Sequence, residues 1–202
     1  MEEAHPPRAP GDSVGSGKEP FRRMPLAVLL VGLTGSGKTT IAQALAGHGY
    51  VRLSVDEEVH RLHGRYGVDY PEDTYFARQR PVLDAVRHRF ATELGAGHDV
   101  VLDHGLWTRS ERDDWKQAAR HAGGLPVLIH LPTDRTELLD RLAARNARED
   151  ANALTVTPEA LDDFIHRFEA PTADENPWDY PGTIEALLAL LQRARIGDHP
   201  LE

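Results

Sequence analysis

The residues best suited to chemistry form a glycine-rich run that ends in lysine and threonine. Residues 32–39 fit the pattern G-x-x-x-x-G-K-[ST] without a mismatch. In such a loop the backbone N–H groups surround phosphate oxygens, the lysine neutralises the β- and γ-phosphates, and the final hydroxyl binds Mg²⁺. The sequence therefore predicts a site for ATP and Mg²⁺. Its predicted nucleotide-binding residues are Gly32, Leu33, Thr34, Gly35, Ser36, Gly37, Lys38, Thr39 and Thr40.

Two aspartates follow short apolar runs and are candidates for the chemical step. Asp56 follows residues 51–55, and Asp103 follows residues 100–102. In parallel sheets, ligands bind at the carboxyl ends of strands. Asp56 is placed to take the proton of an attacking hydroxyl. Asp103 is placed to hold the Mg²⁺ water shell, together with Thr39, or to orient the acceptor; for each aspartate a purely structural helix cap is the alternative.

Three arginines recur along one predicted helix. Arg141, Arg145 and Arg148 are spaced by four and three residues, so they share one helical face. Such a row suits a lid that closes over the transferred phosphate. We predict that Arg145 and Arg148 act with Lys38 in catalysis. For Arg141 we favour a solvated face paired with nearby carboxylates.

The acceptor is expected between the ends of the second and third strands. Residues 57–80 and 104–112 supply aromatic, histidine and arginine side chains, which suit a hydroxylated small molecule. The predicted acceptor-binding residues are Asp56, Arg61, Asp103, His104 and Arg109. Other candidates in these segments include Tyr70, Tyr75, Arg78, Trp107 and Arg112.

Apolar runs and amphipathic segments alternate after residue 26, which predicts an α/β fold with a parallel sheet covered on both faces. The predicted strands are 26–33, 51–55, 100–102 and 126–131. The predicted helices are 38–46, 71–94, 109–121, 134–148, 158–169 and 183–195. Asp134 and Thr157 are the expected N-caps of the two lid helices. A fifth strand is not evident in the turn-rich segment 171–182, so the expected sheet has four or five strands.

Composition narrows the class of protein further. Residues 1–25, rich in proline and glycine, are expected to be a disordered tail, and residues 26–202 form the predicted kinase domain. The net charge of −9 argues against a nucleic-acid partner. No apolar run reaches the roughly 18 residues of a membrane span, and the N-terminus has no apolar core of a signal peptide. These two observations lead us to expect a cytoplasmic location, with which the absence of cysteine is compatible.

Other classes of P-loop protein lack support in this chain. No N-K-x-D tetrapeptide is present for guanine recognition, and no L-S-G-G-Q-like segment is present as in transporter ATPases. A ring-forming ATPase would need Asp-Glu after the third strand, where this chain has Asp103-His104. A kinase-like P-loop domain remains.

The order of the P-loop, Asp56, Asp103 and the segment RLAARNAREDANALTVTPEALDDFIHRFEAP resembles one group of P-loop kinases. The chain is similar over about residues 26–170 to bacterial predicted kinases labelled AAA-family ATPases. These are related to the 5′-hydroxyl kinase module of polynucleotide kinase, zeta toxin and chloramphenicol phosphotransferase. The resemblance implies a nucleoside-kinase-like sheet with an arginine-bearing helical lid. It implies that Asp56 is the general base, that Arg145 and Arg148 contact phosphates, and that Asp103 matches the third-strand aspartate.

The favoured function is transfer of the γ-phosphate of ATP to a hydroxyl of a small molecule. A zeta-toxin-like nucleotide-sugar kinase, which would imply an antitoxin partner, is one alternative. A 5′-hydroxyl polynucleotide kinase is disfavoured by the charge and by Val59, where such enzymes usually have arginine. An ATP-binding switch that transfers no phosphate is the alternative from another class.

Overall fold

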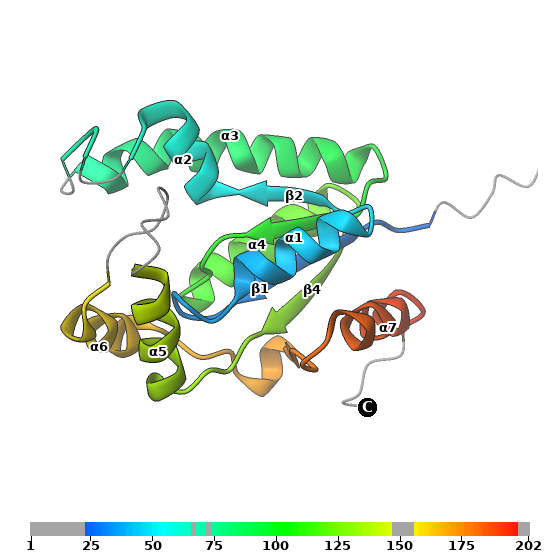
Figure 1. Ribbon diagram of the computed structural model, residues 1–202. Coiled ribbons are helices and arrows are strands. Elements are labelled where there is room, and N and C mark those ends of the chain that lie inside the picture. Colours follow the sequence, from blue (N-terminus) through cyan, green and yellow to red (C-terminus); the bar gives the residue numbers. More distant parts are fainter. Residues whose placement is uncertain (1–22, 66–67, 72–73, 147–155, 198–202) are drawn as a thin grey trace, which may run out of the picture.

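A parallel sheet of five strands forms the centre of the protein (Figure 1). The computed structural model describes residues 23–65, 68–71, 74–146 and 156–197. The strand order is β2-β3-β1-β4-β5, and every neighbouring pair is parallel. The strands are β1 (Leu26–Val31), β2 (Val51–Ser54), β3 (Val100–Asp103), β4 (Leu125–His130) and β5 (Trp178–Asp179).

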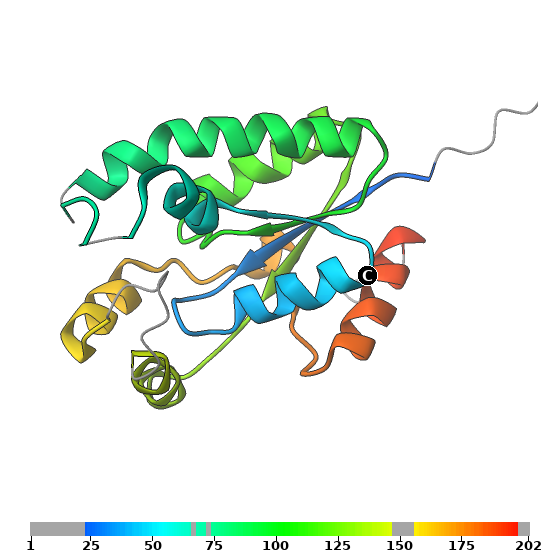
Figure 2. The same ribbon diagram turned by 45° about the horizontal axis from the view of Figure 1, so that its top comes forward.

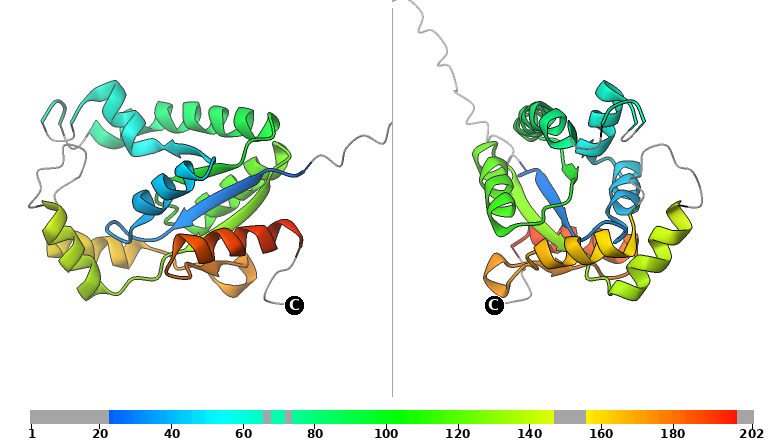
Figure 3. Two further views of the ribbon diagram at one scale, coloured as in Figure 1. Left: turned by 45° about the vertical axis from the view of Figure 1, so that its right-hand side comes forward. Right: turned by 90° about the vertical axis from the view of Figure 1, so that its left-hand side faces the viewer.

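Helices cover both faces of this sheet (Figures 2 and 3). One core contains residues of α2, α3 and α4, and a second contains residues of α1 and α7 on the opposite face. The helices are α1 (Lys38–Gly47), α2 (Val55–His63), α3 (Tyr75–Gly95), α4 (Arg109–His121), α5 (Arg135–Asn146), α6 (Pro158–Arg167) and α7 (Ile184–Arg195). A short 3-10 helix, η2 (Ala173–Glu175), precedes β5. None of the helices in the described part of the chain could span a membrane.

The central strand shows why the sheet must be covered twice. All six residues of β1 are apolar and buried. Ala27, Leu29 and Val31 contribute to the first core. Leu26, Val28 and Leu30 contribute to the second. Side chains alternate between the faces of a strand, so a wholly apolar strand requires a layer on each side. The predicted α/β architecture is confirmed.

Local signals set the helix starts, and most predicted boundaries agree closely. The Asp134 carboxylate accepts a hydrogen bond from the Glu137 N–H at 2.8 Å, as expected for the N-cap of α5. The Thr157 hydroxyl does the same for α6, accepting from the Ala160 N–H at 3.2 Å. Helix α4 begins and ends where the sequence predicts, behind a capping box between Thr108 and Glu111.

Helix α2 was not among the predicted helices, and the predicted end of β2 needs correction. Strand β2 ends at Ser54, whose hydroxyl caps α2, so Asp56 lies in the first turn of α2 rather than at a strand end. The fifth strand, β5, is present within the turn-rich segment. It pairs Trp178 with Ile129 and Asp179 with His130. A strand of only two residues is too short to produce a recognisable apolar pattern in the sequence.

The carboxyl ends of the strands, the start of α1 and the helices α5 and α6 lie at the same end of the molecule (Figure 1). Leu138 and Leu142 of α5 form a small buried cluster with Val156 and Leu161, and Leu33 of the glycine-rich loop packs against it. The helices predicted to form a lid are therefore in contact with the loop.

Of the predicted tail, only residues 23–25 are described, and the Pro25 carbonyl accepts a hydrogen bond from the Leu125 N–H.

Candidate active site

The glycine-rich loop connects β1 to α1 and has the backbone conformation that its glycines permit. Gly35 and Gly37 have φ angles of 83° and 100°, which side chains with a Cβ rarely adopt. A Cβ at Gly35 would also lie 3.2 Å from Cγ of Leu142. Helix α1 begins at Lys38, so its N-terminal N–H groups and positive dipole end face the loop. The predicted phosphate loop is thus well formed.

Lys38 lies inside this loop. Its Nζ donates hydrogen bonds to the carbonyl oxygens of Gly32 at 2.8 Å and Leu33 at 2.7 Å. Burial lowers the pKa of Lys38 to about 8, although the nearby charges of Asp103 and Asp56 oppose this shift. Arg145 adds to the lowering. One ammonium group therefore experiences the charges of both predicted aspartates and of a lid arginine.

The pKa of Lys38 predicts how nucleotide affinity depends on pH. In the free protein Lys38 loses its proton above about pH 8. Bound phosphates raise the pKa of Lys38, so it stays protonated in the complex. Binding then requires proton uptake above that pH, and the Kd for ADP with Mg²⁺ should rise up to about 10-fold per pH unit. Calorimetric titrations from pH 7 to 9.5 measure this. The variant Lys38→Met should bind more weakly with no such rise, and a flat wild-type profile would contradict the prediction.

Thr39 and Asp103 form the candidate metal site. The Thr39 hydroxyl donates to Oδ1 of Asp103 at 3.2 Å, and Asp103 is buried. Its Oδ2 accepts from Nε of Arg52 at 3.0 Å, and Arg52 also binds Glu57 through two hydrogen bonds. Across the described ranges no cluster of three histidine, aspartate or glutamate side chains could hold a metal alone. Hydroxyl and carboxylate oxygens suit Mg²⁺, which usually combines one or two protein ligands with phosphates and water.

Asp56 is fixed by residues of α3. Its Oδ1 accepts a hydrogen bond from the Tyr75 hydroxyl at 2.8 Å. The side-chain amide of Gln79, one turn further along α3, donates to the same hydroxyl at 3.0 Å. Burial, followed by the charge of Asp56, raises the pKa of Tyr75, so this hydroxyl keeps its proton and remains a donor. The sequence placed Tyr75 in the acceptor region but did not reveal this link to Asp56.

Arg145 and Arg141 approach the loop in different ways. Burial lowers the pKa of Arg145, and the carboxylate of Asp56 opposes this effect, so the two charges lie within electrostatic range of each other. Nη1 of Arg141 donates to the carbonyl of Ser36 at 3.1 Å, and Nη2 pairs with Glu137. Arg141 does pair with a carboxylate, but the partner is Glu137 rather than the expected Asp140, Glu149 or Asp150, and its contact with the loop was not predicted. Arg148 lies outside the described residues.

His104 is close to the same group of charges. Burial lowers the pKa of this imidazole, and Asp56, Glu111, Lys38 and Asp103 all influence it. A neutral His104 next to the base is compatible with its predicted role in acceptor binding.

The structure does not bring the other two predicted acceptor-binding residues into this group. Arg61 pairs with Glu58 at 2.6 Å on the exposed side of α2. Arg109 pairs with Asp174 at 2.5 Å, beside η2. Arg112 is a clearer correction, because its guanidinium is fully buried and bound to Glu175, where no acceptor can reach it.

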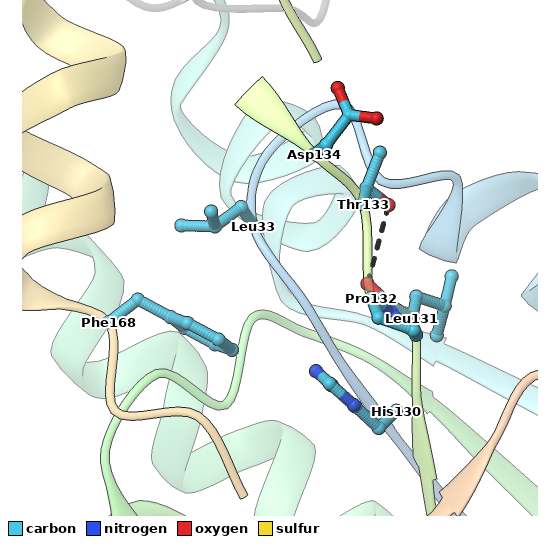
Figure 4. Close-up of a pocket in the computed structure, with 7 residues that line it drawn as sticks. All are labelled: Leu33, His130, Leu131, Pro132, Thr133, Asp134 and Phe168. Atoms are coloured by element: carbon cyan, nitrogen blue, oxygen red, sulfur yellow. Dashed lines mark hydrogen bonds between the residues drawn. The ribbon is translucent and has the colours of Figure 1, made fainter. Parts of the chain in front are cut away.

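A cavity of about 380 Å³ opens beside the loop, between the chain entering α5 and the end of α6 (Figure 4). Leu33 and Phe168 lie on one side of this space, and His130 lies on the other. The remaining lining residues are Leu131, Pro132, Thr133 and Asp134. This cavity was not predicted, because its walls come from three segments that are far apart in the sequence and share no motif.

Comparison with known proteins agrees with this geometry. A family model described as an AAA domain matches residues 28–171. The chain belongs to this family. The matched region of this AAA-domain protein runs from β1 through the helices α5 and α6, so it includes every candidate site residue described above. No curated protein matches the chain.

Solved structures show the fold of the AAA-domain protein. A protein from Chloroflexus aurantiacus J-10-fl matches with a TM-score of 0.68 and 18% identity, covering 87% of this chain and 98% of the other. A gluconokinase from Sinorhizobium meliloti 1021 matches with a TM-score of 0.59 and 21% identity, covering 87% and 97%. The Mycobacterium tuberculosis APS kinase CysC matches with a TM-score of 0.55 and 17% identity, covering 84% and 98%. The predicted P-loop kinase fold is confirmed.

Proposed function

We propose that this protein transfers the γ-phosphate of ATP to a hydroxyl group of a small molecule. The observation that carries the proposal is the grouping of charged side chains at the phosphate loop. Lys38 Nζ is held by the loop carbonyls, the neighbouring Thr39 hydroxyl donates to Asp103 at 3.2 Å, and the charges of Asp103, Asp56 and Arg145 all act on Lys38. A phosphate-binding ammonium, a carboxylate for the proton, a carboxylate beside the metal-binding hydroxyl and a lid arginine thus share one site. This combination is what phosphoryl transfer to an alcohol requires.

Each residue has a defined part in the step. The hydroxyl oxygen of the acceptor forms a bond to the γ-phosphorus, the bond from that phosphorus to the β,γ-bridging oxygen breaks, and ADP leaves. Asp56 takes the proton of the hydroxyl. Lys38 and Arg145 stabilise the negative charge on the transferred group. Thr39 and Asp103 would hold Mg²⁺, which when bound neutralises phosphate charge.

A small acceptor is favoured over a polynucleotide. The net charge of −9 gives no broad attraction for phosphodiesters. The solved neighbours named as gluconokinase and APS kinase are consistent with a small acceptor here, although their low identity supports only the fold. A nucleotide-sugar kinase with an antitoxin partner and a non-transferring ATP switch are outcomes of the test below.

The test is a screen for phosphorylated products. The protein is incubated with ATP and Mg²⁺ and with hydroxylated metabolites, nucleosides, nucleotide sugars, antibiotics and 5′-hydroxyl oligonucleotides, and products are followed by mass spectrometry. The proposal expects a gain of one phosphate on one chemical class and none with Lys38→Met. Phosphorylation of oligonucleotides alone, or bound ATP with no product from any class, would contradict it.

The hydrogen bond from Tyr75 to Asp56 leads to a separate prediction. Tyr75→Phe removes the group that orients the carboxylate, but it leaves the phosphate loop intact. A single hydrogen bond contributes about 1 kcal/mol, so kcat should fall about 5- to 10-fold while the KM for ATP stays unchanged. Steady-state kinetics measure both constants. An unchanged kcat would show that Tyr75 does not position Asp56.

A further inference from the structure

Arg78 of α3 is held near the candidate base by uncharged groups. Its guanidinium carbon lies 4.9 Å from the centre of the Tyr70 ring. Its Nε donates to the Thr74 hydroxyl at 3.2 Å, and its Nη1 lies 3.3 Å from Nδ1 of His63. Because arginine only donates hydrogen bonds, Nδ1 of His63 must be the acceptor. Three neighbours therefore fix the guanidinium without neutralising its charge.

This arrangement differs from that of most other arginines. Within residues 23–65, 68–71, 74–146 and 156–197, Arg78 has no carboxylate oxygen within the 4.0 Å of an ion pair, although its side chain is half-buried. Arg61, Arg65 and Arg89 on the same two helices or their connection pair with Glu58, Asp69 and Glu93. A half-buried and positioned cation without a counter-ion is costly unless something else supplies the negative charge.

The position of Arg78 relates it to the acceptor rather than to ATP. Burial raises the pKa of Tyr70, and the charges of Arg78 and Asp56 both act on this phenol. Tyr75, which donates to Asp56, precedes Arg78 by three residues, so both lie on the same side of α3. Helices α2 and α3 run side by side in Figures 1 and 2 and lie away from the α5–α6 pair that contacts the phosphate loop.

We propose that the acceptor carries an oxyanion, a carboxylate or a phosphate, in addition to its reacting hydroxyl, and that Arg78 binds this group. The inference rests on the proposed function and names the substrate class of the same site. A fixed guanidinium offers parallel N–H groups that match two oxygens of an oxyanion. Arg78 sets which molecules place a hydroxyl at Asp56, and it takes no part in the bond changes.

The experiment uses two pairs of probes that differ only in the anionic group. Gluconate is compared with sorbitol, and glycerol 3-phosphate with glycerol, and the two pairs separate carboxylate from phosphate recognition. The full chain is saturated with ADP and Mg²⁺ so that the phosphate loop is filled. Binding is followed by the NMR signal of the Arg78 Nε–H group, identified by its loss in Arg78→Met. We expect at least one anionic probe to shift this signal and its neutral partner to leave it unchanged.

Kinetics give the second readout, using the acceptor class found in the product screen. Arg78→Met should raise the KM for an anionic acceptor about 10- to 100-fold with little change in kcat, as for loss of a charged hydrogen bond. Arg78→Lys should recover part of this loss. Arg87→Met is the matched control, because Arg87 is also on α3 and stacks on an aromatic ring, that of Trp115, at 4.8 Å. Arg87→Met should leave the KM unchanged.

The outcomes separate this inference from the proposed function. Anion binding at Arg78 without transfer from ATP would support the inference and contradict the function. Transfer to neutral polyols that is as efficient as transfer to their anionic partners would keep the function and overturn the inference. An Arg78 signal that responds to no anion, or equally to both members of each pair, would also overturn it.

Discussion

Asp56→Asn should reduce phosphoryl transfer about 10²- to 10⁴-fold, because an amide cannot take the proton of the attacking hydroxyl. The substitution keeps the size of the side chain and its ability to accept the hydrogen bond that Tyr75 donates to Oδ1. Nucleotide binding should persist, since Asp56 lies on α2 and the phosphates are held by the loop and α1. Product formation and ADP affinity, measured in parallel, separate these two effects.

The matched control for this variant is Asp84→Asn on the exposed side of α3. It removes the same charge and should leave both rate and affinity within a factor of about two. If Asp56→Asn transfers phosphate at the wild-type rate, Asp56 is not the base. In that event His104, whose pKa burial lowers and on which the charge of Asp56 acts, is the next candidate base to replace.

The second large effect concerns stability. Arg112→Met should lower the free energy of unfolding by about 3 kcal/mol, because it leaves the buried Glu175 carboxylate with Lys116, 3.6 Å away, in place of two hydrogen bonds from arginine. Arg112 donates to this carboxylate at 2.7 and 2.9 Å and to the Glu169 carbonyl at 2.8 Å. It thereby ties the chain leaving α6 to α4. Urea unfolding measures the loss. A variant that also carries Glu175→Leu should recover part of it, because no buried carboxylate remains and Lys116 keeps Asp113 as an ion-pair partner at 3.9 Å.

The same pair predicts how stability depends on pH. Burial raises the pKa of Glu175, but hydrogen bonds from Arg112 and from the Thr172 N–H outweigh burial and lower the pKa to about 2. This pKa is below the value in the unfolded chain, so the carboxylate stabilises the fold fully above about pH 4.5. The contribution is lost as the pH falls from about 4.5 toward 2. Arg112→Met should show a smaller loss over that range, and equal losses in both proteins would contradict this account.

The sequence was sufficient for the fold and for the phosphate loop because each depends on local signals. A strand buried on both faces requires an unbroken apolar run, as in β1, and a phosphate loop requires glycines at fixed spacing. Helix starts depend on capping side chains such as Asp134 and Thr157, which are also local. These features were therefore correctly predicted within a few residues.

The missed features depend on contacts between segments far apart in the chain. Tyr75 meets Asp56 only because α3 packs on α2, and Arg141 reaches Ser36 only because α5 packs on the loop. Arg112 was assigned to the acceptor region because its partner Glu175 is 63 residues away. The sheet was predicted to have four or five strands, and β5 could not be placed because two residues carry no periodicity. Asp56 was placed at a strand end because the apolar run 51–55 was interpreted as one strand. In the structure Ser54 caps α2, so the helix has already begun at Asp56.

The most direct test of the central claim follows the γ-phosphate itself. ATP labelled at the γ-position is incubated with Mg²⁺, an acceptor mixture and, in parallel, wild-type protein, Asp56→Asn or Lys38→Met, and the labelled species are separated. The account predicts that wild-type protein moves the label onto a hydroxyl of a small molecule and that both variants form far less of this product. Label that stays in ATP, or that appears only as inorganic phosphate with every acceptor tested, would contradict it.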